Sequence, residues 1–486
     1  MKPSEIKLNI RKDLFEKLGG IEGVVSVTLV GSFVDREDLA GISDIDTIVI
    51  CKSLDKNLFD ACLHAVESVD LKKCGLVNYA LTINPTFGPL KFDKPHLAVI
   101  HLMIYDINAH RRHVLASPFT CFDWERSETV EGLSLKKIFP VGILQNRDFL
   151  EVRRSLKNYL DDLSNSVISY REYDFNGDDV VEIKKNKVLD ELHRGEYAYH
   201  IVRNLIANYL KLCNNNNGSF SNNEIKSEII RLLPKSGNAH AKKFDTIAQI
   251  KSQRANNFPE NTAKWTEAFL EEFQQGITVE WSDAVPIHFI RHFKTNLNDG
   301  TYLGQGRDPA IDTTQDCELI NEPISKFYTS PLRRCVQSAH AINKDMEIVT
   351  DDRLLEFDYG KAEGLTYDQL VNQYPEISIG WQNGEDPRFS AGENTRDVYG
   401  RLKSFLDNLS QSIENNQSGP ICIVTHNGVL RCLLGEAFGL DLNEWHKLVI
   451  PHGIPLEFLY WRNRFYPNIS RTLWFKIFQN IGYAVS

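Results

Sequence analysis

The stretch Val285–Asn298 reads VPIHFIRHFKTNLN and predicts the fold of the C-terminal part of this chain. Its apolar run Ile287–Ile290 (IHFI) is typical of a buried strand. The run leads directly into Arg291 and His292. In α/β sheets, ligand sites gather where strands end at the carboxyl edge. His292 is therefore a candidate nucleophile, beside an arginine that can hold its electrophile.

Three later segments also place polar residues at strand ends and turns. Tyr328–Ala339 (YTSPLRRCVQSA) combines a strand end, a proline turn and two adjacent arginines. Arg353–Gly364 (RLLEFDYGKAEG) carries Glu356 in a glycine-punctuated loop. Thr425–Gly428 (THNG) follows the buried strand Ile421–Val424 and opens a helix, whose free backbone N–H groups suit a phosphate.

Strand and helix signals alternate through this part of the chain. The helix is expected over Val429–Phe438, and Pro455–Trp461 (PLEFLYW) is expected as a late strand. Alternation of this kind predicts a layered α/β domain with a mostly parallel sheet.

The four motifs, in this order, resemble the histidine phosphatase superfamily, which includes the cofactor-dependent phosphoglycerate mutases. The resemblance covers about Pro286–Trp461. The motifs stand here as Arg291-His292-Phe293 with Thr295 and Asn298, then Ser330-Pro331-Leu332-Arg333-Arg334-Cys335, then Leu354-Leu355-Glu356 through Gly364, and last Thr425-His426-Asn427-Gly428.

The resemblance implies a role for each site residue. The implied set is His292 as nucleophile, Arg291, Arg334 and His426 around the phosphoryl oxygens, Asn298 assisting them, and Glu356 as proton donor to the leaving oxygen. Fixed cations and N–H donors are what the negative equatorial oxygens need, and the leaving alkoxide needs an acid. The implied substrate is a small phosphorylated metabolite, and no cofactor is implied for this half.

Some choices stay open within this half. Phe293 stands where glycine is usual, so it is expected to narrow the pocket or reshape the turn. Glu363 is a second candidate acid beside Glu356. Mutases use the same histidine as hydrolases, and we favour hydrolysis.

The N-terminal part predicts a small α/β domain. Strands are expected at Val24–Val30 (VVSVTLV), Asp46–Ile50 (DTIVI) and Leu97–Tyr105 (LAVIHLMIY), with a helix over Leu54–Val66. Interleaved strands and helices of this kind favour an α/β or α+β arrangement.

A second constellation lies between the first two of these strands. Gly31 and Ser32 follow the first strand, and they let the backbone approach a triphosphate closely. Asp44 and Asp46 are alternate residues, so they project to the same side. Two carboxylates aimed at one point suit Mg²⁺, which prefers oxygen ligands and is often shared with nucleotide phosphates.

This pattern resembles the DNA-polymerase-β-like nucleotidyltransferase family, including its small antibiotic-modifying and antitoxin members. The resemblance covers about Val24–Asp106 and implies binding of a nucleoside triphosphate at Gly31 and Ser32. The family adds a third carboxylate on a later strand. Here the expected inward position holds His101, and Asp106 stands at the strand end as the candidate third Mg²⁺ ligand.

The middle of the chain, about Leu144–Gly276, is expected to be helical. Apolar residues recur at helical spacing over Phe149–Leu163 and Val202–Leu210. Asn214–Ser219 (NNNNGS) predicts a loop, and a further helix over Thr262–Phe273 is expected to stop at Gly276.

The chain has 486 residues, which predicts more than one domain. The expected division is a nucleotidyltransferase-like domain at 1–140, a helical domain at 141–280 and a histidine phosphatase domain at 281–486. The fold class is therefore multidomain α/β.

Bulk properties limit the classes of function. The net charge of −10 argues against a broad nucleic-acid-binding surface. Nine scattered cysteines without a Cys-x-x-Cys pair suit a reducing compartment. No apolar run reaches the roughly 20 residues that span a bilayer, and the charged N-terminus lacks a signal-peptide core. We expect a soluble, cytoplasmic protein without a membrane partner; the sequence predicts no oligomeric state.

Three functional hypotheses follow. The first is a bifunctional enzyme that hydrolyses a phosphomonoester at His292 and transfers a nucleotidyl group with Mg²⁺ at Asp44 and Asp46. The second is a phosphatase whose N-terminal module binds a nucleotide without turning it over. The third is a defence or toxin–antitoxin protein that nucleotidylates a partner macromolecule.

Overall fold

A computed structural model gives the fold of the chain. It describes residues 1–482 apart from 36–38, 40–41, 43, 91, 93–95, 118, 120–123, 142, 178, 215–217, 254, 256, 313–319, 321, 344–345 and 416–418. These residues form two compact units, which are described separately. Unit 1 contains residues 1–144, 148–280 and 482–486, and unit 2 contains residues 145–147 and 281–481.

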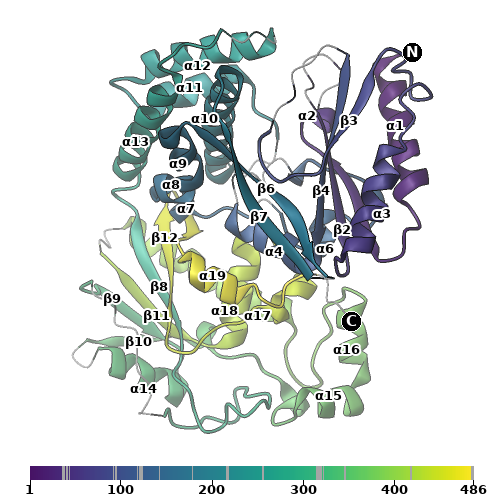
Figure 1. Cartoon of the computed structure of the whole chain (residues 1–486). Coiled ribbons are helices and arrows are strands. Elements are labelled where there is room, and N and C mark those ends of the chain that lie inside the picture. The colour runs from purple at the N-terminus through teal and green to yellow at the C-terminus, as the bar shows by residue number, and fades with distance from the viewer. Residues whose placement is uncertain are drawn as a thin grey trace. The chain divides into compact units, whose positions relative to one another are not determined.

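Unit 1 is built on a five-stranded sheet of order β3-β4-β2-β1-β5 (Figure 1). Its strands are β1 (Val24–Val30), β2 (Ile45–Cys51), β3 (Ala80–Asn84), β4 (Leu97–Asp106) and β5 (Glu128–Gly132). Strand β2 pairs antiparallel with β1 and parallel with β4. The three strands and the helix expected from the N-terminal sequence are confirmed, since α3 occupies Lys56–Glu67.

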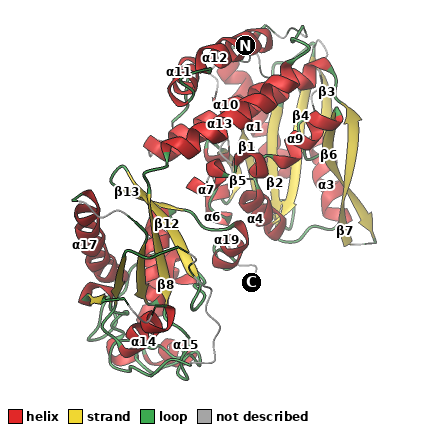
Figure 2. Ribbon diagram, turned by 90° about the vertical axis from the view of Figure 1, so that its left-hand side faces the viewer, coloured by secondary structure: helices red, strands yellow, loops and turns green. Residues whose placement is uncertain are grey.

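The helices of unit 1 fall into two groups along the chain. Those around the sheet are α1 (Pro3–Leu18), α2 (Ser32–Asp35), α3, α4 (Ile107–Ala116) and α6 (Leu135–Ile138). Farther along come α8 (Val152–Ser155), α9 (Lys157–Asn165), α10 (Glu191–Asn214), α11 (Asn222–Leu232), α12 (Gly237–Ser252) and α13 (Thr262–Glu280). Figure 2 shows α10–α13 gathered beside the sheet of the same unit.

The all-helical expectation for the middle of the chain is wrong. Strands β6 (Val167–Asn176) and β7 (Asp179–Val188) form an antiparallel hairpin. The predicted helix over Phe149–Leu163 is broken into short helices at Leu156, which caps α8. Helix α7 (Asn146–Leu150) is divided between the two units.

The expected end of the last middle helix is also wrong. Helix α13 continues through Gly276 to Glu280. A Cβ at Gly276 would lie 2.8 Å from the carbonyl oxygen of Leu232, so the glycine allows α11 to approach closely instead of ending the helix. The predicted loop at 214–219 falls partly outside the described residues.

Unit 2 is a layered α/β domain with a six-stranded sheet of order β10-β9-β11-β8-β12-β13. Its strands are β8 (Val285–Arg291), β9 (Lys326–Thr329), β10 (Ile348–Thr350), β11 (Ile421–Thr425), β12 (Pro455–Trp461) and β13 (Arg464–Pro467). The first four are parallel to one another, and β12 and β13 are antiparallel additions. The mostly parallel sheet predicted from the sequence is confirmed.

Helices pack on this sheet and extend from it. They are α14 (Arg333–Ile342), α15 (Tyr367–Gln373), α16 (Pro375–Gln382), α17 (Thr395–Glu414), α18 (Asn427–Ala437) and α19 (Arg471–Ile477), with 3₁₀ turns η1 (Asp352–Leu354), η2 (Gly360–Ala362) and η3 (Leu442–Lys447). Helix α14 packs on β9 and β11, and α18 packs on β8 and β13 (Figure 1).

The division into two units differs from the three expected domains. The boundary after Glu280 is shared, but the segments expected as separate domains at 1–140 and 141–280 lie in one unit. The seven described cysteines are free thiols, and Cys121 and Cys317 lie outside the described residues.

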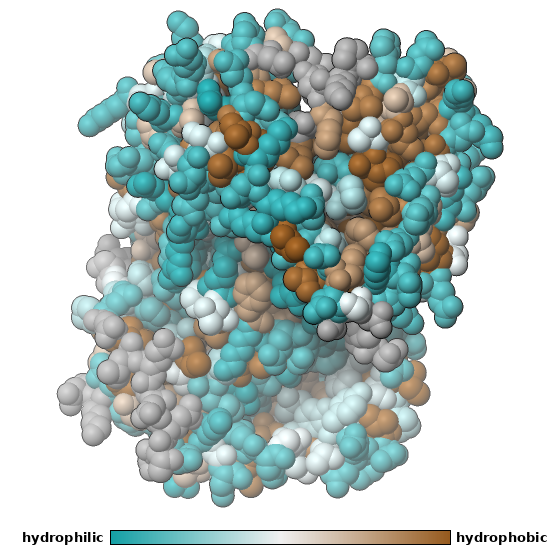
Figure 3. Space-filling view, viewed as in Figure 1, coloured by the Kyte–Doolittle hydropathy of each residue, from teal (hydrophilic) through white to brown (hydrophobic). Residues whose placement is uncertain are grey.

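Hydrophilic side chains cover most of the face seen in Figure 3, with apolar side chains in smaller groups among them. Among the described helices, none combines the length and apolar composition that a membrane crossing needs.

Candidate active site

Three neighbouring parallel strands of unit 2 end together, and polar residues follow each of them. In the register of β8 and β11, Arg291 pairs with Thr425. The backbone N–H of His292 donates to the carbonyl of Thr425 at 2.9 Å, and that of Ser330 donates to Val424 at 3.1 Å. The residues that follow these strands therefore share one edge of the sheet, as the sequence predicts.

His292 is buried, and one hydrogen bond fixes its tautomer. Its Nδ1 lies 2.6 Å from the carbonyl oxygen of Phe293. Because a carbonyl oxygen only accepts, Nδ1 carries the proton and Nε2 keeps its lone pair. Burial, followed by the charges of Arg291 and Arg334, holds the pKa of His292 well below its usual value. The ring is therefore neutral at neutral pH.

The side chain of Arg334 is fully buried and held from several sides. It donates to the carbonyl oxygens of Gly304 at 2.9 Å and Arg307 at 3.0 Å, and it pairs with Asp308 at 3.2 Å. These contacts fix a positive charge in advance of any ligand.

Arg291 is the second guanidinium of the site. Its Nη1 donates to the carbonyl of Ile450 at 2.8 Å. Burial lowers the pKa of Arg291 to about 10, and the negative charge of Glu356 opposes this shift. The Nε atoms of Arg291 and Arg334 are buried without a hydrogen-bond partner among the described residues, which suits a site for an anion.

Glu356 is buried against the start of α18. Its Oε1 accepts from the backbone N–H groups of Phe357 and Gly428, both at 2.9 Å. A Cβ at Gly428 would lie 2.6 Å from Oε1, so a glycine is required for this approach. Two donors on one oxygen fix the orientation of the carboxyl group.

Glu363, the second candidate acid, is used differently. Its carboxylate accepts from the backbone N–H groups of Gly304, Gly306 and Arg307 at 2.7–3.2 Å. The carbonyls of two of these residues bind Arg334. Glu363 therefore stabilises the loop that positions this arginine.

His426 lies beside His292, with ring centroids 5.3 Å apart. Its Nε2 is 2.8 Å from the hydroxyl of Ser330 and 3.3 Å from the sulfur of Cys335. Burial, then the charge of Arg334, lowers the pKa of His426 well below its usual value. A second neutral imidazole thus lies beside His292 at this edge of the sheet.

Asn298 lies on the turn that follows His292. It is exposed, and its Oδ1 accepts from the backbone N–H of Thr295 at 2.8 Å and from the hydroxyl at 3.2 Å. Among the described residues, its hydrogen bonds stabilise the turn after His292.

Five residues of the sequence motifs thus lie at one edge of the sheet: Arg291, His292, Arg334, Glu356 and His426. Residues 287–465 match the histidine phosphatase superfamily (branch 1). Unit 2 therefore contains a histidine phosphatase-type domain.

Relatives of this domain differ in how much of their length is matched. Phosphoserine phosphatase 1 of Hydrogenobacter thermophilus is 29% identical over 175 residues, which are 33% of this chain and 80% of the relative. 6-phosphofructo-2-kinase/fructose-2,6-bisphosphatase 4 of Homo sapiens is 29% identical over 163 residues, 32% of this chain and 33% of the relative. The chain thus spans only a third of the second relative.

Solved structures include the alpha-ribazole phosphatase from Shigella flexneri. It is 21% identical with a TM-score of 0.33, and the match covers 38% of this chain and 97% of that structure.

Phe293 departs from the usual histidine phosphatase motif without lining the cavity described below. Its side chain is buried, and its backbone N–H donates to the hydroxyl of Ser338 at 2.9 Å. Whether it narrows the phosphate pocket or reshapes the turn after His292 stays a prediction.

His452 was not singled out from the sequence. Its Nδ1 donates to the carbonyl of His292 at 2.8 Å, and the two rings lie 5.3 Å apart. Burial, with a smaller effect of Arg291, lowers the pKa of His452 to about 4. His452 stands just before the predicted strand Pro455–Trp461. Pairing of that strand with β8 brings His452 close to His292, and this is the sequence feature that could have identified it.

A cavity of about 250 Å³ adjoins Glu356 in the histidine phosphatase-type domain. Gly428 and Phe357, which bind the Glu356 carboxylate, are part of its lining. Half of the residues that line it are aromatic: Tyr302, Phe357, Tyr359, Tyr367, Trp381, Phe389, Trp445 and His446.

Arg431 adds a cation to this aromatic wall. Its Nε donates to the carbonyl of Leu448 at 2.8 Å. Burial lowers the pKa of Arg431, while Tyr359 and Glu356 act in the opposite direction. Glu385 and Asp386 line the same cavity, so it offers flat apolar surfaces together with one cation and two carboxylates.

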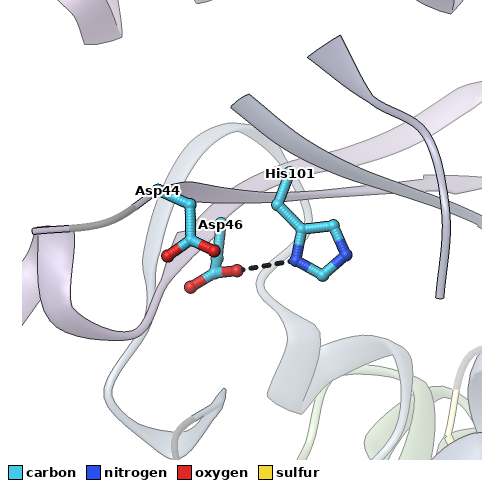
Figure 4. Close-up of side chains that lie close together, drawn as sticks. All are labelled: Asp44, Asp46 and His101. Atoms are coloured by element: carbon cyan, nitrogen blue, oxygen red, sulfur yellow. Dashed lines mark hydrogen bonds and ion pairs between the residues drawn. The ribbon is translucent and has the colours of Figure 1, made fainter. Parts of the chain in front are cut away.

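Unit 1 brings together part of the second predicted constellation. Ligand atoms of Asp44, Asp46 and His101 lie within 4.8 Å of one another (Figure 4). The register of β2 and β4 pairs Asp46 with His101, as expected for the inward position. Asp44 and His101 are buried, and Asp46 is half-buried.

Asp106 is not part of this cluster, and its expected role as third ligand is wrong. In the same register Asp106 pairs with Cys51, five residues beyond the His101 pair. At about 3.3 Å per residue, this places it roughly 16 Å away along the strand. Its Oδ1 instead accepts from the backbone N–H of Ala109 at 2.6 Å and caps α4.

Gly31 lies directly against this cluster. It has a φ of +71°, and a Cβ there would lie 2.7 Å from Oδ2 of Asp46. Ser32 begins the short helix α2. The backbone at these residues therefore adjoins Asp46; their expected nucleotide-binding role stays a prediction.

Proposed function

We propose that the histidine phosphatase-type domain hydrolyses a small phosphomonoester through a phosphorylated His292. The observation that carries this proposal is the hydrogen bond from Nδ1 to the carbonyl of Phe293. It directs the lone pair of a neutral ring to Nε2, the atom that must attack. The two fixed guanidinium groups beside the ring supply the charge that a phosphoryl group needs.

The reaction has two balanced steps. Nε2 of His292 bonds to phosphorus as the bond to the alcohol oxygen breaks, and Glu356 gives that oxygen a proton from Oε2. Water then returns a proton to Glu356 and bonds to phosphorus as the bond to Nε2 breaks. The products are the alcohol and inorganic phosphate.

The other residues stabilise charge. Arg291 and Arg334 hold the equatorial oxygens, and His426 lines the same space. Asn298 is proposed to assist from the turn that follows His292.

Hydrolysis is favoured over mutase activity. The relatives named above are called phosphatase or bisphosphatase, which supports transfer of the phosphoryl group to water. The chain covers only part of the longer relative, so its substrate is not carried over.

The cavity beside Glu356 supports a substrate class. The leaving alcohol must occupy the side of the phosphoryl group that faces the acid. Aromatic walls favour an alcohol that carries a flat or ring-shaped part, and Arg431, Glu385 and Asp386 offer partners of both charges to its polar groups.

The test is a phosphate-release screen on the full-length protein. Phosphorylated sugars, nucleotides, glycerates, phosphoserine and aryl phosphates form the panel, with His292→Ala assayed beside the wild type. Release that depends on His292 is expected, with the highest kcat/KM for substrates whose alcohol carries a ring. Equal release by the variant would overturn the assignment.

We infer a second function for unit 1, nucleotidyl transfer that depends on a divalent cation at Asp44 and Asp46, for which the sequence predicts Mg²⁺. The cluster of these carboxylates with His101 supports a site for a divalent cation. A bound cation supplies charge that screens a triphosphate and stabilises departing pyrophosphate. Gly31 keeps the backbone close to Asp46, where the triphosphate is expected.

Labelled nucleoside triphosphates, supplied with Mg²⁺ and in parallel with Mn²⁺, test this function. Pyrophosphate release that is lost in Asp44→Asn supports transfer by a bifunctional enzyme. Binding without release favours a nucleotide-binding module, and label on a co-purified macromolecule favours modification of a partner.

A further inference from the structure

His101 makes two close contacts that a neutral imidazole cannot satisfy alone. Its Nε2 lies 2.8 Å from the carbonyl oxygen of Thr86. Its Nδ1 lies 2.9 Å from Oδ1 of Asp46, the contact marked in Figure 4. The carbonyl and an ionised carboxylate both only accept, and a neutral ring has one N–H. Either the ring holds a second proton, or a cation lies between Nδ1 and the carboxylate.

The arrangement around His101 suits a metal ion as the cation. The bond to Thr86 assigns the N–H to Nε2 and directs the lone pair of Nδ1 toward Asp46, which is how proteins orient a histidine ligand. Two ligands at right angles, each about 2.1 Å from an ion, lie about 3 Å apart. The 2.9 Å separation of Nδ1 and Oδ1 matches this spacing.

Asp44 completes the donor set. Its ligand oxygen lies within 4.8 Å of those of Asp46 and His101, so one ion can reach all three. Asp44 and His101 are 6% and 8% exposed and Asp46 is half-buried, and holding two carboxylates close together partly away from water favours a bound cation.

We propose that Asp44, Asp46 and His101 bind one divalent transition-metal ion in preference to Mg²⁺. Imidazole nitrogen is a ligand of transition metals, whereas Mg²⁺ takes oxygen ligands and keeps several waters. The proposal deepens the nucleotidyl transfer site by naming its metal class. The binding itself does not depend on transfer.

Mn²⁺ is the probe, because the electron paramagnetic resonance signal of the free ion is lost when the ion binds to a protein. The full-length protein is titrated with MnCl₂ and without nucleotide. We expect one binding site for Mn²⁺. The electron spin-echo spectrum of the bound ion should show coupling to a nitrogen of the His101 ring. His101→Ala should weaken binding on the order of tenfold or more and remove the nitrogen couplings. His64→Ala, an exposed histidine of the same unit, is the matched control and should leave both unchanged.

A second variant reverses the selectivity. His101→Asp gives three carboxylates and should lower the ratio of Mn²⁺ to Mg²⁺ affinity on the order of tenfold. His101→Asn, whose amide can still bind Thr86, replaces the alanine variant if that protein does not fold.

Two results would overturn the proposal: wild-type binding no tighter than that of His101→Ala, or an unchanged metal ratio in His101→Asp. Mn²⁺ binding through His101 without pyrophosphate release would uphold the site while rejecting nucleotidyl transfer. The two proposals therefore fail separately.

Discussion

The backbone N–H of Gly428 donates to Oε1 of Glu356 at 2.9 Å and joins the loop after η1 to the first turn of α18. The contact leaves no space for a Cβ, which would lie 2.6 Å from the carboxylate oxygen. The position of the candidate acid thus depends on the absence of a side chain at residue 428.

Gly428→Ala should therefore displace Glu356 and lower kcat/KM by about tenfold or more, because small misplacements of a catalytic group are costly. Gly400→Ala is the matched control, since a Cβ at this position in α17 meets nothing within 4 Å. The control should retain full activity and the same or slightly higher stability. Steady-state kinetics with an aryl phosphate make the measurement, and full activity in Gly428→Ala would contradict the geometry.

Glu356→Gln should slow the hydrolysis of alkyl phosphates more than the hydrolysis of aryl phosphates. An alkoxide needs a proton to leave, and general acid catalysis contributes about 10²- to 10⁴-fold. An activated phenolate leaves without much help. The comparison of kcat/KM for both substrate types tests this, with the exposed Glu376→Gln as control. Equal losses for both substrates would argue against a role as acid.

His292→Ala should lower phosphate release by about a thousandfold or more, because the proposed nucleophile is lost. Rapid acid-free quenching with ³²P-labelled substrate should trap a phosphoenzyme in the wild type and none in the variant. His340→Ala removes an exposed histidine of the same unit and should behave as the wild type. A trapped phosphoenzyme in His292→Ala would rule out the assignment.

The ring of His292 should stay neutral below the usual histidine range. Burial and two arginines lower its pKa, so the attacking form persists as the pH falls through 6.5. Histidine ¹⁵N shifts, assigned with the His292→Ala variant, should keep their neutral values, with Nδ1 protonated, as the pH falls through the usual histidine pKa of about 6.5. Half-protonation at pH 6.5 or above would contradict the electrostatics.

Buried His110 in unit 1 should make stability depend on pH. Burial, then His113 and Arg111, lowers its pKa to about 3, and both ring nitrogens lack partners among the described residues. The unfolded chain then binds the extra proton, so the contribution of this ring to stability rises with pH from about 3 to 6.5, by up to about 1.4 kcal/mol per pH unit. His113, whose pKa burial also lowers to about 3, adds a contribution of the same sign. His110→Phe should therefore reduce the slope in denaturant unfolding without abolishing it, and exposed His64→Phe should leave it unchanged. An unchanged slope in His110→Phe would contradict the shift.

Much of the histidine phosphatase-type domain could be predicted because its motifs are local. The strand at Ile287–Ile290 and the helix after His426 have clear apolar patterns, and the site residues follow strands directly. His452 escaped notice because its neighbourhood depends on antiparallel pairing of β12 with β8, which links distant residues. The lining of the cavity beside Glu356 depends on side-chain packing in the same way.

The N-terminal unit was predicted less completely. The sequence placed His101 at the inward position of its strand, and the structure adds that it pairs with Asp46 in the register of β2 and β4. Asp106 was misplaced because a carboxylate at a strand end has a competing local use as a helix cap. The β6–β7 hairpin was missed because the helical spacing of neighbouring segments was extended over residues rich in tyrosine, phenylalanine and valine, which favour strands.

The three residues 145–147 belong to unit 2 although they stand far upstream of it in the chain. The side chain of Gln145 accepts the backbone N–H of Ile469 at 2.9 Å, and Arg147 donates to the carbonyl of Asn468 at 3.5 Å. A fragment that starts at residue 281 would leave the buried amide of Ile469 unsatisfied. Expression of the two units as separate proteins therefore needs more than one cut at residue 281. Residues 145–147 have to be supplied to unit 2, either by circular permutation or by co-expression of that segment.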